Sequence, residues 1–454
     1  MIIKNNLKKS RLTLAFLALM TLLSACGEQL TPPVKVAEMT SVQVVKDITY
    51  LASDNLKGRA SFSPEIDQAA DYISERFTEI GLIPLAGSKD FKQTFKVTSI
   101  MPSSLTVTLN GNAIEATQLA MASTIAVIKW DGTEDVNTHI IGKSDDMRAA
   151  LGKMNNEGGQ HFVMIHSTHA KIFAGYQGYF KRGLTKLSLK QQGAIVMVLA
   201  DDSEITSLAV NAATNITEKT LTNIVAILPG KDKNLEKAKE IVLYSSHYDH
   251  LGLSADGKEV FNGADDDASG TSAVINLAQH FASQGNNKRT LMFSAFTAEE
   301  IGGFGSKYFS QQLNPDDVVA MINIEMIGKP SKFGAGTMWM TGMERSNLGE
   351  LLNASLQEKS TKVYKDPYPK QGLFYRSDNA TLARLGVPAH SFSSTQLDKD
   401  QHYHQTSDDI NSLDLDSMYK VIESLSIATQ GLVDGSITPT RIDINTVRTS
   451  GKIY

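Results

Sequence analysis

From Asn223 onward, short apolar runs alternate with longer segments of helical periodicity. The runs are rich in Val, Ile, Leu and Phe, as in strands buried on both faces of a mainly parallel sheet: Ile241–Ser245, Leu291–Phe296 and Val318–Ile324. Helices are expected at Ala268–Gln284, Phe304–Leu313, Ser346–Lys359, Ser377–Leu385 and Leu413–Leu432. This repetition of strand, loop and helix predicts an α/β/α layered domain with right-handed crossovers.

The first half of the chain has a different texture. Helices are expected at Ser41–Leu51 and from Ile66, where Gly81 is placed to end the second one. Four β-like runs then follow between polar connections: Leu105–Leu109, Thr124–Trp130, His161–His166 and Ala194–Leu199. We therefore expect residues 39–100 and 221–436 to form the layered domain, residues 101–220 a β-rich insert, and residues 437–454 a tail.

The N-terminus predicts export. Basic residues precede an apolar run, Leu12–Leu23, that is too short to span a bilayer. Leu23-Ser24-Ala25-Cys26 resembles a bacterial lipobox, which implies that residues 1–25 are a signal peptide and that Cys26 carries lipid. Gly27 favours sorting to the outer membrane, facing the periplasm, with residues 26–38 as a tether. Because Cys26 is the only cysteine, an internal disulfide is excluded.

Charge limits the kinds of partner. The net charge is −5 even though four basic residues lie in the export segment, so the rest of the chain is more acidic still. Nucleic-acid binding needs clustered Lys and Arg, and this balance argues against it. Peptides and, through the lipid, a membrane are the expected partners.

Metal-binding residue types follow each predicted buried strand. They are His247 with Asp249, Glu299 with Glu300, and Glu325, while Asp265-Asp266-Asp267 opens the first crossover helix. Ligands of open α/β sheets bind outside the carboxyl ends of the strands, so these groups should converge on one crevice. Carboxylates at that density would repel one another without a compensating cation.

The residue types indicate which metal and which chemistry. Imidazole with carboxylate, and no thiolate, suits zinc better than calcium or magnesium. Glu299 and Glu300 are adjacent and point in different directions, so one can bind metal while the other reaches a water. A Lewis acid beside a general base is what hydrolysis of a peptide bond requires.

Five motifs in order resemble the M28 family of zinc exopeptidases, which includes bacterial aminopeptidases, glutamate carboxypeptidase and glutaminyl cyclases. They are His247-Tyr248-Asp249, Gly263–Gly270, Glu299-Glu300, Asn323–Gly328 and Tyr403-His404. The resemblance covers about half of the chain. The insert resembles a protease-associated domain more faintly, mainly over Gly193–Val198.

The resemblance implies two zinc ions per chain. It places His247 and Glu325 on one ion, Glu300 and His404 on the other, and Asp266 on both. Glu299 would be the general base, and Asp249 would orient His247 without binding metal. Asp267 would follow Asp266 through a peptide bond that is cis in some relatives. The family usually has Asp where this chain has Glu325.

Other polar and aromatic residues near these motifs have plainer interpretations. Asp265, Asp267, Asp408 and Asp409 are expected to be helix caps or solvated carboxylates. His250 and His402 could be partners of the ligands or exposed residues, and the insert's His161, His166 and His169 are expected to be ordinary histidines. Tyr368, Phe374 and Tyr375 could line a substrate pocket or pack in the core.

The expected activity is removal of N-terminal residues from peptides by a zinc-dependent aminopeptidase. A carboxypeptidase or dipeptidase of the same family is the alternative, since substrate orientation depends on loops. A glutaminyl cyclase fits less well because those relatives bind one zinc and lack the His-x-Asp ligand. A non-catalytic binding protein on this scaffold fits least, since no ligand is missing.

Overall fold

The computed structural model describes residues 36–132, 134–189, 192–201, 204–359 and 361–449. The predicted signal peptide, Cys26 and most of the predicted tether lie outside these residues. The described residues from Ala37 onward form one compact unit. No helix within the described ranges has the length and apolarity needed to cross a membrane.

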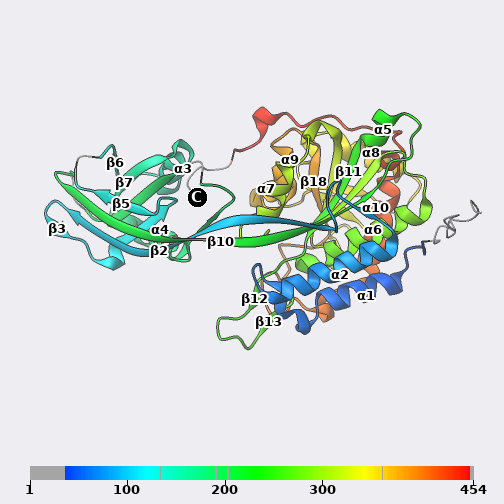
Figure 1. The fold of residues 1–454 in the computed structure, drawn as a ribbon, viewed down its shortest axis with the longest axis horizontal. Coiled ribbons are helices and arrows are strands. Elements are labelled where there is room, and N and C mark those ends of the chain that lie inside the picture. Colours follow the sequence, from blue (N-terminus) through cyan, green and yellow to red (C-terminus); the bar gives the residue numbers. More distant parts are fainter. Residues whose placement is uncertain (1–35, 133, 190–191, 202–203, 360, 450–454) are drawn as a thin grey trace, which may run out of the picture. The chain divides into compact units, whose positions relative to one another are not determined.

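Four parallel strands form the middle of the main sheet (Figure 1). Their order is β14 (Thr290–Phe296), β11 (Ile241–His247), β15 (Val318–Ile324) and β18 (Ala389–Ser393). Strands β10 (Leu208–Leu228) and β16 (Met338–Met340) flank them in antiparallel pairing, and β17 (Val363–Lys365) pairs in parallel with β16. The predicted α/β layered fold with a mainly parallel central sheet is confirmed.

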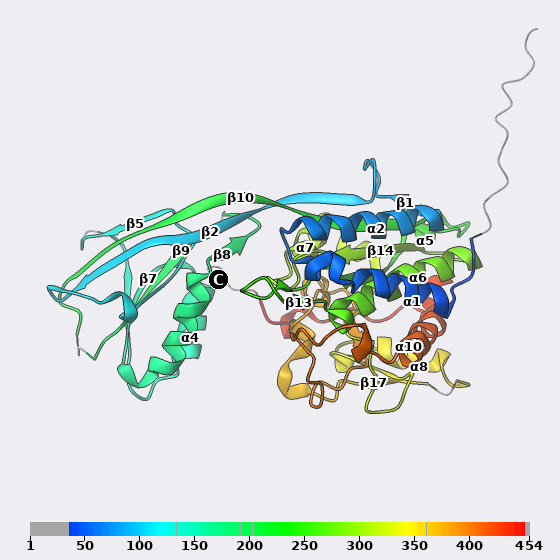
Figure 2. The ribbon, with the colours of Figure 1, turned by 90° about the horizontal axis from the view of Figure 1, so that it is seen from below.

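Helices cover both faces of this sheet (Figure 2). One face is covered by α6 (Gly270–Gln284), which contacts α1 (Ser41–Leu51), α2 (Pro64–Ile80) and α10 (Leu415–Ala428). The other face packs against α7 (Phe304–Ser310) and α9 (Asn379–Ala383). Because both faces are covered, the strands are buried along almost their whole length, and β11, β14 and β15 contain apolar runs.

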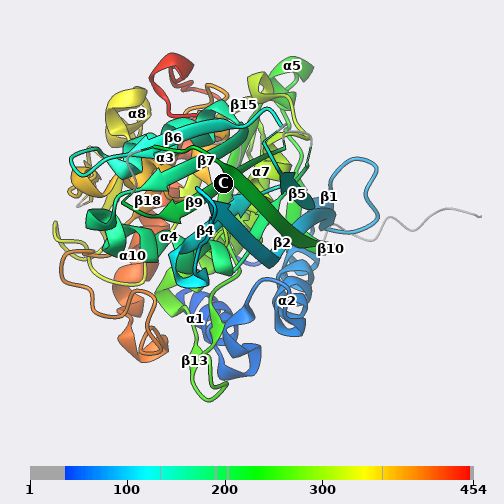
Figure 3. The same ribbon diagram turned by 90° about the vertical axis from the view of Figure 1, so that its left-hand side faces the viewer.

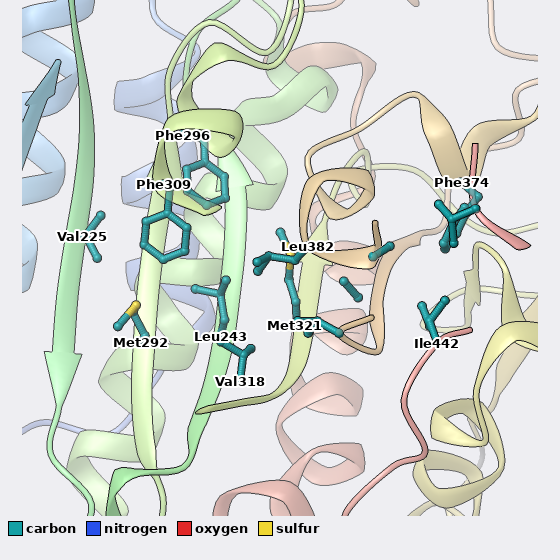
Figure 4. Packing of buried hydrophobic residues seen from close by; sticks show 14 residues of the cluster. Val225, Leu243, Met292, Phe296, Phe309, Val318, Met321, Phe374, Leu382 and Ile442 are labelled. Atoms are coloured by element: carbon teal, nitrogen blue, oxygen red, sulfur yellow. The ribbon is translucent and has the colours of Figure 1, made fainter. Parts of the chain in front are cut away.

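Successive residues of β11 point to opposite faces of the sheet. Leu243 lies in the buried cluster that includes Phe309 of α7 and Leu382 of α9 (Figure 4). Tyr244 faces the other way, where its ring packs 5.4 Å from that of Phe281 in α6. Its hydroxyl donates to Thr429 at 2.7 Å, which satisfies the one polar group of this buried side chain.

The remaining helices of the layered domain are α5 (Leu235–Lys239), α8 (Leu348–Ser355) and α11 (Gln430–Val433). Gly81 ends α2 in the left-handed conformation, as predicted. The predicted helix Leu413–Leu432 begins at Leu415, because the Asp414 side chain caps it by accepting from the Ser417 N–H. It divides at Thr429 into α10 and α11.

The insert is joined to the layered domain by the long antiparallel strands β2 (Lys92–Leu109) and β10. Both predicted domain boundaries therefore fall inside strands. A separate sheet has the order β4 (Leu119–Ser123), β9 (Gly193–Leu199), β7 (Gly159–Ile165) and β6 (Asn137–Ile141) (Figure 3). Short strands complete the described chain: β1 (Ile83–Pro84), β3 (Asn112–Ala113), β5 (Val127–Trp130), β8 (Leu184–Lys186), β12 (Gly252–Leu253) and β13 (Val260–Phe261).

Two helices of the insert, α3 (Met147–Glu157) and α4 (Ala170–Lys181), were not predicted. Leu151 of α3 and Phe173 of α4 are buried in one cluster with Val163 and Ile195 of the insert sheet. The opposite face of that sheet packs against residues of β2 and β10. Burial of these few apolar side chains stabilises helices whose sequence periodicity is weak.

The described part of the predicted tail packs onto the layered domain. Ile442 and Val447 belong to the same buried cluster as Leu243. The buried guanidinium of Arg289 donates to the carbonyl of Ile437 at 2.6 Å. Ile442 and Val447 are therefore part of the core of this domain, while most residues around them in 437–449 are exposed.

Candidate metal centre

All seven predicted site residues meet at the carboxyl ends of the parallel strands. β11 ends in His247, Glu299 and Glu300 follow β14, and Glu325 follows β15. Asp266 lies in a π-helical turn, η4 (Ala264–Ser269), directly before α6. His404 comes from the loop 394–409 that follows β18. The strand order places these elements side by side, so the crevice predicted from the sequence is present.

The first possible ligand group contains His247, Asp266 and Glu325, whose donor atoms all lie within 4.8 Å of one another. His247 Nε2 is 3.2 Å from Asp266 Oδ1. The other ring nitrogen, Nδ1, is 3.1 Å from the Asp249 carbonyl. Because a carbonyl can only accept, Nδ1 carries the proton and the Nε2 lone pair is left for a cation.

The second possible ligand group shares Asp266. His404 Nε2 is 3.2 Å from Asp266 Oδ2 and 3.3 Å from Glu300 Oε2. The two oxygens of Asp266 thus face different histidines, which is the geometry of a carboxylate that bridges two cations. His250 also lies here, with Nδ1 2.7 Å from Glu300 Oε1, and His250, Asp266 and Glu300 are close enough together to hold an ion.

Unsatisfied buried nitrogens test whether cations fit. The Nε2 atoms of His247, His250 and His404 are buried and make no well-aligned hydrogen bond, although those of His247 and His404 lie 3.2–3.3 Å from carboxylate oxygens. A buried polar atom without a partner costs about 1–3 kcal/mol, so three in one cluster call for a ligand. Nitrogen and carboxylate oxygen donors without thiolate are a zinc-type set. The residues fit two cations that share Asp266.

The pKa shifts of the buried ionisable groups also favour bound cations at this site. Burial raises the pKa of Glu325 to about 7. Burial also raises the pKa of Glu299 well above its ordinary value, and the Asp378, Glu325 and Glu300 carboxylates add to this rise. Burial lowers the pKa of His404, but contacts with Asp266 and Glu300 outweigh it and raise the pKa to about 10. Divalent cations would relieve this repulsion between buried acids.

Asp249 is buried beside the ligands but contacts other groups than predicted. Its carboxylate accepts from the Glu299 N–H at 3.0 Å and from the Ser61 hydroxyl at 2.8 Å. The carboxylate is 3.8 Å from His247 Nδ1, and the closer partner of that nitrogen is the Asp249 main-chain carbonyl. Asp249 therefore holds the backbone that carries Glu299, and orientation of His247 by its carboxylate stays a prediction.

Three acids expected to be caps or solvated are instead buried supports of the site. Asp267 accepts from the Gly270 N–H as a helix-starting Asp should, and it also accepts from the N–H groups of Met326 and His247. The peptide bond between Asp266 and Asp267 is cis, as the resemblance implied. Asp267, which directly follows Asp266, thus ties together the turns that carry the other two residues of the first group, His247 and Glu325.

Asp265 and Asp408 act in the same way. Asp265 accepts from the Gly328 N–H at 2.7 Å, and Asp408 accepts from the N–H groups of Asp265 and Asp266 at 3.2 Å. Both are fully or nearly fully buried, so the solvated interpretation was wrong for them. Asp409 matches the expectation of a cap, since it accepts from the Asn411 N–H, and Asp267 matches it in part through the Gly270 N–H.

Three turns of the site adopt an unusual backbone conformation. Ala298, Met326 and His404 have φ values of 59°, 54° and 57°, which side-chain-bearing residues rarely adopt. Ala298 precedes Glu299, and Met326 follows Glu325. Such conformations persist only where surrounding contacts hold them, and they gather at functional sites.

Arg59 was missed by the sequence analysis. It is fully buried, and its guanidinium donates to the carbonyls of Leu51, Asn262 and Gly263. Only glycine fits at position 263 of this turn, because a Cβ atom there would clash with the carbonyl oxygen of Asp266 and with the ring of His250. A single arginine far away in sequence carries no signal that could have revealed this contact.

A pocket of about 320 Å³ opens beside the possible ligands. Glu299, Glu300, Asp266 and Glu325 line it together with Trp339, Leu373, Leu397, Arg376 and Tyr403. None of the three aromatics that could have lined a pocket is among the residues that line this one. Tyr368 packs against its lining residues Trp339 and Leu373, and Phe374, with Tyr375 against it, belongs to the central core.

The remaining histidines have ordinary partners. His402 Nδ1 contacts the carbonyl and hydroxyl oxygens of Ser407. In the insert, His161 and His169 contact the carbonyls of Gly158 and Gly142, and His166 contacts Thr168. Among the described residues, these histidines form no group able to hold a metal.

Comparison with known proteins matches residues 223–428 to the family model described as "Peptidase family M28". Leucine aminopeptidase 1 of Penicillium rubens is 29% identical over 206 residues, which cover 43% of this chain and 52% of that protein. Leucine aminopeptidase 1 of Neurospora crassa is 25% identical over 268 residues, or 57% of this chain and 63% of that protein. The chain thus spans little more than half the length of these curated relatives.

Two solved structures share the fold. An aminopeptidase from Aneurinibacillus sp. strain AM-1 superposes with a TM-score of 0.54 at 19% identity, covering 92% of this chain and 98% of that one. A zinc aminopeptidase from Bacillus subtilis gives a TM-score of 0.52 at 15% identity, covering 92% and 99%. At these identities the likeness shows the fold alone.

Proposed function

Because residues 223–428 make this chain a member of peptidase family M28, we propose that the protein is a zinc-dependent aminopeptidase, which removes N-terminal residues from peptides. The observation that carries the proposal is the sharing of Asp266 between two groups of possible zinc ligands beside a pocket. The names of the relatives support the aminopeptidase direction.

Two zinc ions are proposed per chain. His247 and Glu325 would hold one, Glu300 and His404 the other, and Asp266 both. Zinc in this position supplies a Lewis acid that polarises the scissile carbonyl and makes the attacking water more acidic. His250 contacts Glu300 through Nδ1 and would fix the orientation of that carboxylate.

Glu299 is the proposed general base. Its carboxylate lines the pocket next to the ligand Glu300, and its backbone is fixed by Asp249. Burial raises its pKa above the ordinary value of a glutamate, and a stronger base binds the proton that it accepts more tightly. Glu299 would take one proton from the attacking water and then deliver a proton to the departing amine.

Peptides blocked at one end test this function. We expect a peptide amide with a free N-terminus to lose its first residue, and an N-acetylated peptide with a free C-terminus to remain intact. A strong chelator should abolish the activity, and added zinc should restore it. Mass spectrometry of the products at successive times shows which end of each peptide is shortened and how chelator and zinc change the rate. Cleavage from the carboxyl end would favour a carboxypeptidase instead, and activity unaffected by chelation would contradict the metal site.

The proposed location is the outer membrane, on the periplasmic side, with lipid on Cys26 as the anchor. This proposal rests on the basic segment, the apolar run and the Leu23-Ser24-Ala25-Cys26 motif. Cys26→Ser should move the protein from the membrane fraction to the soluble fraction of the cell, as followed by immunoblot after fractionation. Continued association of the variant with membranes through a high-salt wash would place the anchor elsewhere.

A further inference from the structure

Arg376 brings a positive charge to a pocket whose other charged lining residues are acids. The pocket's acidic residues are Asp266, Glu299, Glu300, Glu325 and Asp400, and Arg376 is its one Lys or Arg among the described residues. The side chain of Arg376 is exposed, so its guanidinium is accessible from solvent.

Arg376 lies beside one of the two proposed metal positions. Its Nη2 donates to the Tyr403 hydroxyl at 3.2 Å, and the Tyr403 ring stacks on His404 with the ring centroids 3.9 Å apart. The guanidinium therefore lies beside Tyr403, whose ring packs on the proposed zinc ligand His404.

No acidic residue that lines the pocket forms an ion pair with Arg376 among the residues that the structure describes. Asp400 pairs with Lys329 at 2.9 Å, and Lys329 also lies 3.4 Å from Asp265 and 3.7 Å from Asp408. Arg376, by contrast, has no carboxylate within ion-pair distance in the described part of the chain, and its hydrogen-bond partners are the neutral Tyr403 and Gln371. A guanidinium in this state can accept a carboxylate through two parallel N–H groups.

We infer that Arg376 binds a carboxylate of the peptide substrate, an inference that rests on the proposed peptidase function. The volume of about 320 Å³ is at the small end for ligand pockets, which favours a short peptide whose terminal carboxylate reaches Arg376. An acidic side chain is the other source of the same chemistry. In either case, Arg376 offsets the repulsion that the pocket's acids exert on an anionic substrate.

Pairs of substrates that differ by one carboxylate test this. Leucyl-alanine and its C-terminal amide differ in the terminal carboxylate; glutamyl-alanine amide and glutaminyl-alanine amide differ in the side chain. Arg376→Gln should lower kcat/KM for the acid member of at least one pair by roughly tenfold relative to the neutral member, because a hydrogen bond to a charged group is lost while part of the guanidinium stays in solvent. The affected pair identifies the source.

Three further variants sharpen the test. Arg376→Lys keeps the charge without the planar fork and should restore part of the ratio. Tyr403→Phe keeps the ring on His404 but removes the hydroxyl that holds Arg376, so the same ratio should shift by less. Lys370→Gln, an exposed cation in the preceding turn that does not line the pocket, should leave it unchanged.

The ratio of kcat/KM for the acid substrate to kcat/KM for the neutral substrate separates loss of carboxylate binding from general damage. Misfolding would lower kcat/KM for both members of a pair equally. Thermal melting of each variant checks the fold. Equal losses for both members of both pairs in Arg376→Gln would overturn the role of Arg376. A wild-type protein that cleaves none of the four substrates would instead contradict the peptidase function on which the inference rests.

Discussion

Replacing Glu299 with glutamine should reduce kcat by roughly 10²–10⁴-fold, the usual contribution of a general base, while the zinc content stays near that of the wild type. The amide has the same shape but accepts no proton at neutral pH. Glu299 is absent from both groups of close metal-binding atoms, and its backbone N–H, which Asp249 holds, is unchanged. Steady-state kinetics on a free-N-terminal peptide, with elemental analysis of the same sample, measure both quantities.

Glu350→Gln is the matched control for this substitution. Glu350 is exposed on α8 and does not line the pocket, and its replacement by glutamine removes the same single negative charge. Its kinetics should equal those of the wild type. If Glu299→Gln retained wild-type turnover, the general base would have to be another group.

Asp266→Asn should remove bound metal as well as activity. Its two oxygens are each 3.2 Å from a different histidine, Oδ1 from His247 and Oδ2 from His404, so both proposed ions depend on it. An amide carries no negative charge and has one oxygen in place of two. The loss in zinc affinity should exceed the roughly 10–100-fold cost of losing a partner outside the metal's own ligands. Titration with zinc under a competing chelator gives the affinity.

Folding must be separated from metal binding in this variant. Asp409→Asn serves as the control, because Asp409 is a nearby Asp that caps a turn and lies in neither ligand group. It should keep about two ions per chain. Circular dichroism of metal-free Asp266→Asn and metal-free wild type should agree. Two tightly bound ions in Asp266→Asn would rule out a shared carboxylate at this position.

Much of the layered domain could be predicted because its signals are local. Val318–Ile324 is a strand with the predicted bounds, and Gly81 ends its helix as expected. Covered strands read as continuous apolar runs, and helix ends are marked by residues with special backbone or capping chemistry. The helices α3 and α4 of the insert were not predicted from the sequence, and burial of Leu151 and Phe173 against the insert sheet stabilises them.

The place of the site also followed from the sequence. Residues just after parallel strands must meet at one edge of the sheet, whatever their separation in the chain. His247, Glu299 and Glu325 each follow a different strand, and the structure brings them together. The type of each ligand and the edge where it lies were therefore properties of the sequence.

The supporting contacts could not be predicted. Arg59 lies 203 residues before Asn262, whose carbonyl it binds, and no local pattern reports such a pairing. Asp265, Asp267 and Asp408 have the same side chain whether it caps a helix in solvent or accepts buried N–H groups. Burial decides between these uses, and burial depends on elements from the whole chain.

The alternation of strands and helices after Asn223, the residue types of the proposed zinc site and the sheet edge that carries them could all be predicted from the chain, because these features depend on neighbours in sequence. The packing of distant segments sets how Asp266 turns one oxygen to His247 and the other to His404, and it places Arg376 in the lining of the pocket. Those directions depend on turns with positive φ at Met326 and His404 and on contacts between distant segments. A hydrogen bond depends on ångström-scale geometry, which emerges only when all the packed elements are in place.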